Sequence, residues 1–302
     1  MGADAIEPDI VPTRDGVLVL RHENEISLTT DVAAHPEFAN RKTTKTIDGK
    51  KLSGWFTEDF TWAELSTLRS RERLPKIRRS NTMFDGLDGI LRLRDLFTIL
   101  DVSPRPVGMV AEIKHASYFE SIGLPTDDLF VAELREAGWL GDARLTIEAF
   151  EKSVLHKIRD RGVAGKIVYL IEASGSPADA VALHGAGAAN YASSLTDAGL
   201  ASLAKLVDGI SVDKRLLLHT DGAENTVGLT NLVDRAHAAG LTIFCWTLRA
   251  ENHFLGKNFR RGGGADQFGD WLGEFQLIMA SGIDGVFADQ PDLAIEARAR
   301  LQ

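Results

Sequence analysis

Cysteine is almost absent from this chain. Its 302 residues include one, Cys245, which excludes an internal disulfide framework and a metal site built from several cysteines. No apolar stretch is long enough to cross a bilayer, and the amino terminus lacks the basic and then apolar pattern of a signal peptide. The sequence therefore predicts no stable membrane anchor, and it leaves the compartment and the oligomeric state open.

Positively charged residues are fewer than negatively charged ones. The chain has 34 Lys and Arg against 43 Asp and Glu, a formal net charge of −9. This balance argues against nucleic acid or a membrane surface as a general partner, because both are polyanionic. A small phosphorylated molecule remains possible, since a bound metal or a lysine can reverse the local field.

Short β-type runs alternate with amphipathic helical segments along most of the chain. The predicted strands are residues 5–10, 109–114, 144–150, 166–172, 209–213, 241–247 and 285–289, and the clearest helices are 151–161, 198–206, 229–239 and 292–301. Strands separated by helices indicate βαβ units and a parallel sheet. An eight-stranded α/β barrel needs one strand more than these seven, whereas an open doubly wound sheet does not.

Residues 27–100 interrupt this alternation of strands and helices. The stretch is polar, and we interpret it as an insertion with helices near 62–70 and 91–100. The remaining pattern predicts one domain over residues 1–302.

The segment before the insertion carries two acids and a histidine. Asp15-Gly16 favours a two-residue hairpin turn, in which Asp9 faces His22 across the ladder and Glu7 lies on the same side as Asp9. Two adjacent carboxylates repel each other unless a cation neutralises them, and hard divalent cations prefer such oxygen ligands. A charged surface hairpin with cross-strand pairing is the alternative.

A second carboxylate lies in an apolar strand. Glu112 and Lys114 share one face of residues 109–114, and burial of either charge alone is costly. At the carboxyl end of a barrel strand, Glu112 could complete a three-carboxylate metal site and Lys114 could contact a phosphate oxygen. A structural ion pair of Glu112 with Lys114 or an arginine is the alternative.

These segments together resemble the glycerophosphodiester phosphodiesterases. The resemblance covers residues 2 to about 295 and rests on five motifs in the same order, which are residues 2–9, Thr13-Arg14-Asp15-Gly16 followed by His22, Glu112-Ile113-Lys114, Trp246-Thr247 and residues 284–292. The insertion, with Thr30-Asp31-Val32-Ala33, is similar to that of the larger, often periplasmic or secreted branch.

The resemblance implies a metal-dependent (β/α)₈ TIM barrel and a role for each matching residue. Glu7, Asp9 and Glu112 match the ligands of one divalent cation, Ca²⁺ or Mg²⁺, and His22 matches one of two catalytic histidines. Lys114 matches a phosphate-binding lysine. Trp246 and Phe287 would shape the pocket for glycerol or the alcohol, although core packing is an equally good reading of both aromatic residues.

The chain departs from the family pattern at its beginning. Family members start with a strand that bears His-Arg-Gly, and no such motif occurs here. We therefore expect the first strand and helix to lie upstream of Met1 and the 302-residue chain to be impaired. The function expected is hydrolysis of glycerophosphodiesters to sn-glycerol 3-phosphate and an alcohol. There are two alternatives. One is a catalytically inactive barrel that binds metal or phosphodiester, and the other is a phospholipase D-like barrel of the sphingomyelinase type.

Overall fold

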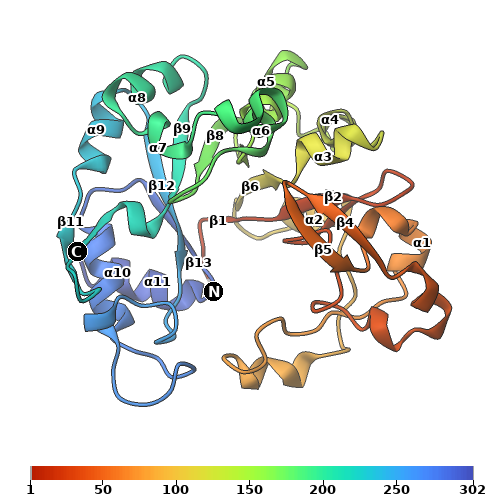
Figure 1. The fold of residues 1–302 in the computed structure, drawn as a ribbon, viewed down its shortest axis with the longest axis horizontal. Helices are drawn as coiled ribbons and strands as arrows, with labels where there is room; N and C mark the ends of the chain where they lie inside the picture. Colours follow the sequence, from red (N-terminus) through yellow and green to blue (C-terminus); the bar gives the residue numbers. More distant parts are fainter. Residues whose placement is uncertain (1, 302) are drawn as a thin grey trace. The chain divides into compact units, whose positions relative to one another are not determined.

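The computed structural model describes residues 2–301, which form two compact units (Figure 1). The amino-terminal unit is Ala5–Gly165, and the carboxy-terminal unit begins at Lys166 and includes the residues up to Asp4. Within residues 2–301, no helix combines the length and the apolar character needed to cross a membrane. The single-domain organisation over residues 1–302 stays a prediction.

The sheet of the amino-terminal unit is centred on β6. Strands β1, β2 and β7 pair with β6 in parallel, and β3 pairs with β2 in antiparallel orientation. Glu7 and Pro8 separate β1 from β2, because proline has no N–H to donate to a ladder. The predicted strand 5–10 is therefore present as two pieces. The strands are β1 (Ala5–Ile6), β2 (Asp9–Pro12), β3 (Leu18–Leu20), β6 (Gly108–Ile113) and β7 (Leu145–Ala149).

The insertion contains a hairpin that the sequence interpretation missed. Strands β4 (Thr43–Ile47) and β5 (Lys50–Gly54) meet at Asp48 and Gly49, whose φ angles of 49° and 77° suit a tight hairpin turn. Helix α1 (Trp62–Leu65) covers only the first turn of the helix predicted near 62–70, whereas α2 (Leu93–Asp101) matches the second prediction. The insertion packs its apolar side chains against Val11 and Val19 of the β2–β3 hairpin.

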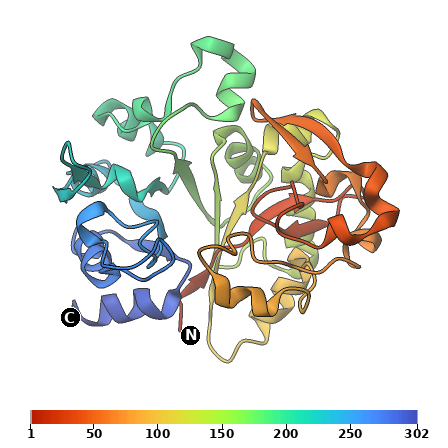
Figure 2. The same cartoon turned by 60° about the horizontal axis from the view of Figure 1, so that its bottom comes forward.

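Helices follow the strands of this unit as expected for βα connections (Figure 2). Helix α5 buries Val154, Leu155 and Ile158, one face of the predicted helix 151–161. The remaining helical elements are α3 (Ala116–Ser121), α4 (Thr126–Ala137), α5 (Lys152–Asp160), and the 3-10 helices η1 (Val32–Ala34), η2 (Pro36–Arg41), η3 (Thr57–Asp59) and η4 (Arg79–Phe84).

The carboxy-terminal unit has a parallel sheet in the order β13-β12-β9-β8. Its strands are β8 (Lys166–Ile171), β9 (Gly209–Asp213), β12 (Thr242–Leu248) and β13 (Gly285–Ala288), and β10 (Leu218–Thr220) pairs with β11 (Thr226–Leu229). All seven predicted strands are thus confirmed.

Three predicted helices of this unit are also confirmed, although the one expected at 229–239 begins later because Leu229 ends β11. The helical elements are α6 (Ala178–His184), α7 (Tyr191–Ser194), α8 (Asp197–Leu203), α9 (Leu232–Ala238), α10 (Trp271–Met279), α11 (Pro291–Ala299), η5 (Gly185–Gly187), η6 (Lys214–Leu216) and η7 (Lys257–Phe259).

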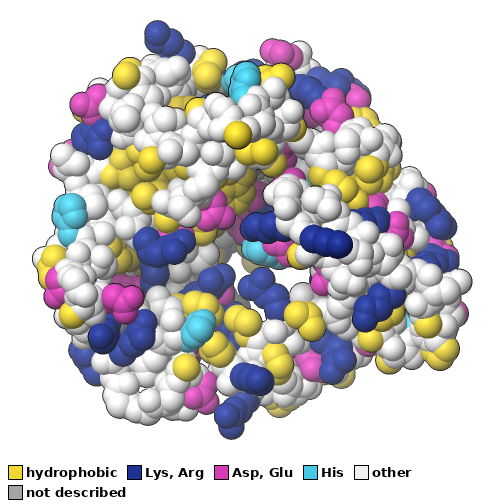
Figure 3. Space-filling view, in the orientation of Figure 1, with side chains coloured by type: hydrophobic (Ala, Val, Ile, Leu, Met, Phe, Trp, Pro, Cys, Tyr) yellow, Lys and Arg dark blue, Asp and Glu magenta, His cyan; other side chains and the backbone are white. Residues whose placement is uncertain are grey.

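Charged side chains of both signs are interspersed on the surface. On the face shown in Figure 3, Lys and Arg lie among Asp and Glu. Opposite charges also pair within each unit, as Arg144 does with Asp142 in the amino-terminal unit and Arg235 with Asp197 in the carboxy-terminal unit.

Candidate active site

Three carboxylates meet in the amino-terminal unit. Oxygen atoms of Glu7, Asp9 and Glu112 all lie within 4.8 Å of one another. Asp9 is the register partner of Glu112 in the parallel β2–β6 pair, so both side chains point to the same face of the sheet. Glu7 joins them from the break between β1 and β2. The structure thus brings together the three residues predicted as metal ligands, while their role as ligands stays a prediction.

Lys114 lies against two of these acids. Its Nζ is 3.0 Å from Asp9 Oδ1 and 2.8 Å from Glu112 Oε1, and its side chain is 8% exposed. The ion pair left open as an alternative for Glu112 is therefore present. Burial lowers the pKa of Lys114, but the carboxylates of Glu112 and Asp9 outweigh burial and raise this pKa above its ordinary value.

Glu112 itself is held in an unfavourable environment for a negative charge. Burial, with a contribution from Asp9, raises its pKa to about 7 against the opposing effects of Lys114 and His22. One lysine therefore does not compensate the acids of this cluster.

A fourth acid next to this cluster was missed from the sequence. Glu148 is the register partner of Glu112 in the parallel β6–β7 pair, and it is 2% exposed. Burial, followed by the charges of Glu112 and Glu7, raises its pKa well above the ordinary value. The signal was available, because Glu148 lies in an apolar strand as Glu112 does, and the same burial argument applies to it.

His22 reaches the cluster through a different hairpin register than predicted. The pairs are Ile10 with Leu20 and Val11 with Val19, and the N–H of Arg21 donates to the carbonyl of Asp9 at 2.9 Å. Asp9 therefore faces Arg21, and the prediction that it faces His22 is wrong.

The cause of the shift is a three-residue loop, residues 14–16, in place of the two-residue turn. The backbone N–H of Thr13 donates to the carbonyl of Val17, Gly16 adopts a φ of 78°, and Asp15 Oδ1 accepts from Thr13 Oγ1 and from the N–H of Trp62.

His22 nevertheless lies beside the acids. It lines a pocket of about 250 Å³ together with Glu7 and Asp9, and its side chain is 50% exposed. The structure thus brings His22 together with Glu7 and Asp9 of the acidic cluster.

A series of hydrogen-bonded and ion-paired side chains extends from His22 to the insertion. His22 Nδ1 is 3.1 Å from Glu23 Oε1, His115 Nε2 is 3.0 Å from Glu23 Oε2, and His115 Nδ1 is 2.5 Å from Asp48 Oδ2. Both ring nitrogens of His115 face carboxylates, which only accept hydrogen bonds, so the ring donates twice and is protonated. Burial opposes this charge, but the bonds to Asp48 and Glu23 outweigh it and raise the pKa of His115 to about 9.

Comparison with known proteins agrees with this geometry. The model of the Glycerophosphoryl diester phosphodiesterase family matches residues 1–293. The chain belongs to this family. It is therefore an enzyme of the phosphoric diester hydrolase class. Glycerophosphodiester phosphodiesterase GDPD6 of Arabidopsis thaliana is 31% identical over 298 residues, which span 95% of this chain and 76% of that protein.

Solved structures show the family fold. A protein of Silicibacter pomeroyi assigned to the same family superposes with a TM-score of 0.66 at 16% identity, covering 99% of this chain and 84% of that one. An Oleispira antarctica phosphodiesterase, in complex with the product sn-glycerol-3-phosphate, superposes with a TM-score of 0.62 at 16% identity, covering 99% and 86%. The fold is thus α/β, of the TIM-barrel type of these phosphodiesterases, as predicted.

The acidic cluster fits the divalent cation that this family implies. Carboxylate oxygens are the donors that hard divalent cations prefer, and Glu148 adds a buried oxygen, Oε2, without a hydrogen-bond partner. Glu7, Asp9 and Glu112 could therefore hold one metal ion.

The two aromatic residues predicted to contact substrate lie in the carboxy-terminal unit. Trp246 lies on β12 and donates from Nε1 to the carbonyl of Ser211 at 3.3 Å. Phe287 lies on β13 and is partly buried. Their contact with substrate stays a prediction.

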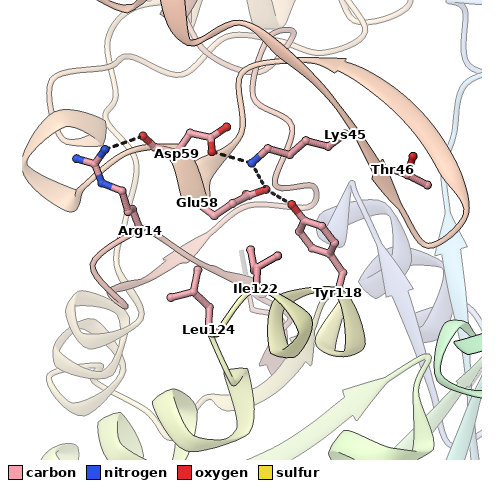
Figure 4. A pocket seen from close by; sticks show the side chains of 9 residues that line it. Arg14, Lys45, Thr46, Glu58, Asp59, Tyr118, Ile122 and Leu124 are labelled. Carbon is pink, nitrogen blue, oxygen red and sulfur yellow. Dashed lines mark hydrogen bonds and ion pairs between the residues drawn. The ribbon is translucent and has the colours of Figure 1, made fainter. Parts of the chain in front are cut away.

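A second pocket of the amino-terminal unit, of about 620 Å³, lacks such a cluster (Figure 4). Lys45 Nζ bridges Glu58 Oε1 at 2.9 Å and Asp59 Oδ1 at 2.7 Å, and Tyr118 Oη donates to Glu58 Oε1 at 2.6 Å. Lys45 bridges both acids of this pocket, whereas around Glu112 three acids have oxygens close enough to hold one metal ion, so the cluster around Glu112 is the better candidate for the active site.

Proposed function

We propose that this protein hydrolyses glycerophosphodiesters to sn-glycerol 3-phosphate and an alcohol such as choline or ethanolamine. The observation that carries the proposal is the cluster of Glu7, Asp9 and Glu112 with Lys114 and His22 beside it. Membership in the family supports the reaction class, and the related structure with bound sn-glycerol-3-phosphate supports the product.

Glu7, Asp9 and Glu112 would hold one divalent cation, Ca²⁺ or Mg²⁺. The cation supplies positive charge that offsets charge developing on the phosphate oxygens. Lys114 contributes a second positive charge to the same end of the site. These residues bind and orient the phosphodiester, and they make its phosphorus more open to attack by an oxygen nucleophile.

His22 is proposed to move the proton. As nucleophilic attack forms a new P–O bond, the P–O bond to the departing alcohol breaks, and that alcohol oxygen needs a proton. The half-exposed imidazole of His22 can deliver or accept it as general acid or base. Trp246 and Phe287 are proposed to shape the pocket for glycerol or the alcohol.

A binding protein without turnover is the second candidate. One histidine that starts in one protonation state does not serve both the nucleophile and the leaving group in the same step. The 302 residues contain His22 but no His-Arg-Gly motif. A site in which His22 were the sole proton-transferring group would bind the phosphodiester without fast turnover.

The test is hydrolysis of glycerophosphocholine by the purified chain with Ca²⁺ or Mg²⁺, read as release of sn-glycerol 3-phosphate. We expect measurable activity that Glu112→Gln and His22→Ala abolish, whereas His219→Ala, at an exposed histidine, retains it. Sphingomyelin is the comparison substrate for the phospholipase D-like alternative. If sn-glycerol 3-phosphate binds in calorimetry without any turnover, the binding protein is the better description. If it neither binds nor is produced, the proposed function is wrong.

A further inference from the structure

One row of acids crosses three neighbouring strands. Asp9 on β2 is in register with Glu112 on β6, and Glu112 is in register with Glu148 on β7. Register partners in a parallel sheet project to the same face, and neighbouring strands are only about 4.8 Å apart. Glu148 therefore points to the same side of the sheet as the two acids already placed in the cluster.

Glu148 is buried and incompletely satisfied. It is 2% exposed, and its Oε2 has no hydrogen-bond partner. Glu112, in contrast, has the ammonium group of Lys114 at 2.8 Å. A buried carboxyl oxygen without a partner costs free energy, so its retention in the strand needs an explanation.

Glu148 lies beside Glu112 in the sheet, and the neighbouring charges act on it. The charges of Glu112, Glu7 and Asp9 all act on its carboxyl group, and Lys114 opposes them. Three acids and one lysine thus act on the carboxyl group of Glu148, a balance that disfavours its negative charge unless more positive charge is present.

We propose that Glu148 is a fourth carboxylate ligand of the divalent cation in this site. The inference rests on the proposed function, which gives that cation three ligands. Ca²⁺ takes six to eight oxygen ligands, whereas Mg²⁺ keeps several waters and uses one or two carboxylates. A fourth carboxylate therefore favours Ca²⁺. Glu148 is not among the acids whose oxygens lie within 4.8 Å of one another, so its unsatisfied Oε2 would join the ion after the side chain rotates toward it.

The experiment is calorimetric titration of the chelator-treated full chain with calcium chloride. We expect Glu148→Gln to weaken Ca²⁺ binding at least about tenfold, the lower end of what supporting groups at metal sites contribute. Glu133→Gln is the matched control, because Glu133 is also buried with an unsatisfied Oε2 but pairs with Arg94. This control should bind Ca²⁺ as the unchanged protein does.

The cation-free melting temperature is measured for each variant. Glu148→Gln should melt no lower than the unchanged protein, because the amide removes an acid from a group of acids. Glu148→Met, which keeps the volume and removes both oxygens, should lose Ca²⁺ affinity in the same way.

Two results would separate this inference from the proposed function. Equal Ca²⁺ affinity in Glu148→Gln and the unchanged protein overturns the fourth ligand and leaves the three-carboxylate site intact. No Ca²⁺ or Mg²⁺ binding by the unchanged protein overturns the metal site itself, and the fourth ligand with it. If the Glu148 variants do not fold without the cation, the inference also fails, because Glu148 is then needed for the fold.

Discussion

Lys114 illustrates how one buried cation pairs with two acids at once. Its ammonium group lies within 3.0 Å of Asp9 and Glu112, and its side chain is 8% exposed. Removing one partner of a buried ion pair leaves an uncompensated charge, which is more costly than losing the pair as a whole.

We expect Lys114→Met to lower the free energy of unfolding by about 3–5 kcal/mol when divalent cations are chelated. Added Ca²⁺ should narrow this difference, because a bound cation compensates the same carboxylates. Urea denaturation with and without Ca²⁺ measures both effects. Lys205→Met, at an exposed lysine, is the control, and an equally small loss in both variants would contradict the prediction.

The raised pKa of His115 predicts that the free energy of unfolding depends on pH. Its pKa is raised from 6.5 to about 9 in the folded state, so the folded state holds the proton more tightly than the unfolded chain. The stabilisation is fully present below about pH 6.5 and is lost as the pH rises through about 9. It amounts to on the order of 3 kcal/mol.

Urea denaturation at a series of pH values tests this prediction. The unchanged protein should lose stability over that window relative to His115→Gln, which carries no titrating group at this position. His219→Gln should follow the profile of the unchanged protein. Identical profiles for all three proteins would show that His115 is not charged in the fold.

The β4–β5 hairpin places Asp48 against His115. Asp48 and Gly49 form its turn. Gly49 has a φ of 77°, a backbone angle that residues other than glycine rarely adopt. A Cβ at this position would meet no atom within 4 Å, so a substitution here changes the backbone preference alone.

Gly49→Ala should therefore destabilise the protein by about 1–2 kcal/mol, the cost of a left-handed conformation for an L-residue. It should also lower the pKa of His115, because Asp48 would be held less firmly against the ring. Denaturation and a histidine titration by NMR measure the two effects. Gly141→Ala also meets no atom within 4 Å and no positive φ is present there, so it should be neutral or slightly stabilising.

At the scale of the whole molecule, a cation that binds only the folded state must stabilise it. The expected gain is about 2.7 kcal/mol at a concentration one hundred times the dissociation constant. A thermal unfolding series with increasing Ca²⁺ should show a rising melting temperature. The triple variant Glu7→Gln, Asp9→Asn, Glu112→Gln should show no such rise, and an equal rise in both proteins would place the cation elsewhere.

Local sequence patterns were enough to predict the order of the seven parallel strands, the family, and Glu7, Asp9 and Glu112 as acids that meet. Alternating apolar runs and helical segments carry that information locally, and Glu112 in an apolar strand already indicated a buried acid with a partner. The same local argument would have found Glu148.

The register of the β2–β3 hairpin and the partners of His115 depend on packing between distant segments and could not be predicted from local patterns. The hairpin loop depends on Asp15 accepting from the N–H of Trp62, 47 positions away, and His115 is held by Asp48, 67 positions away. Contacts between residues so distant in the chain leave no periodic pattern in the sequence, because they form only when separate elements pack together.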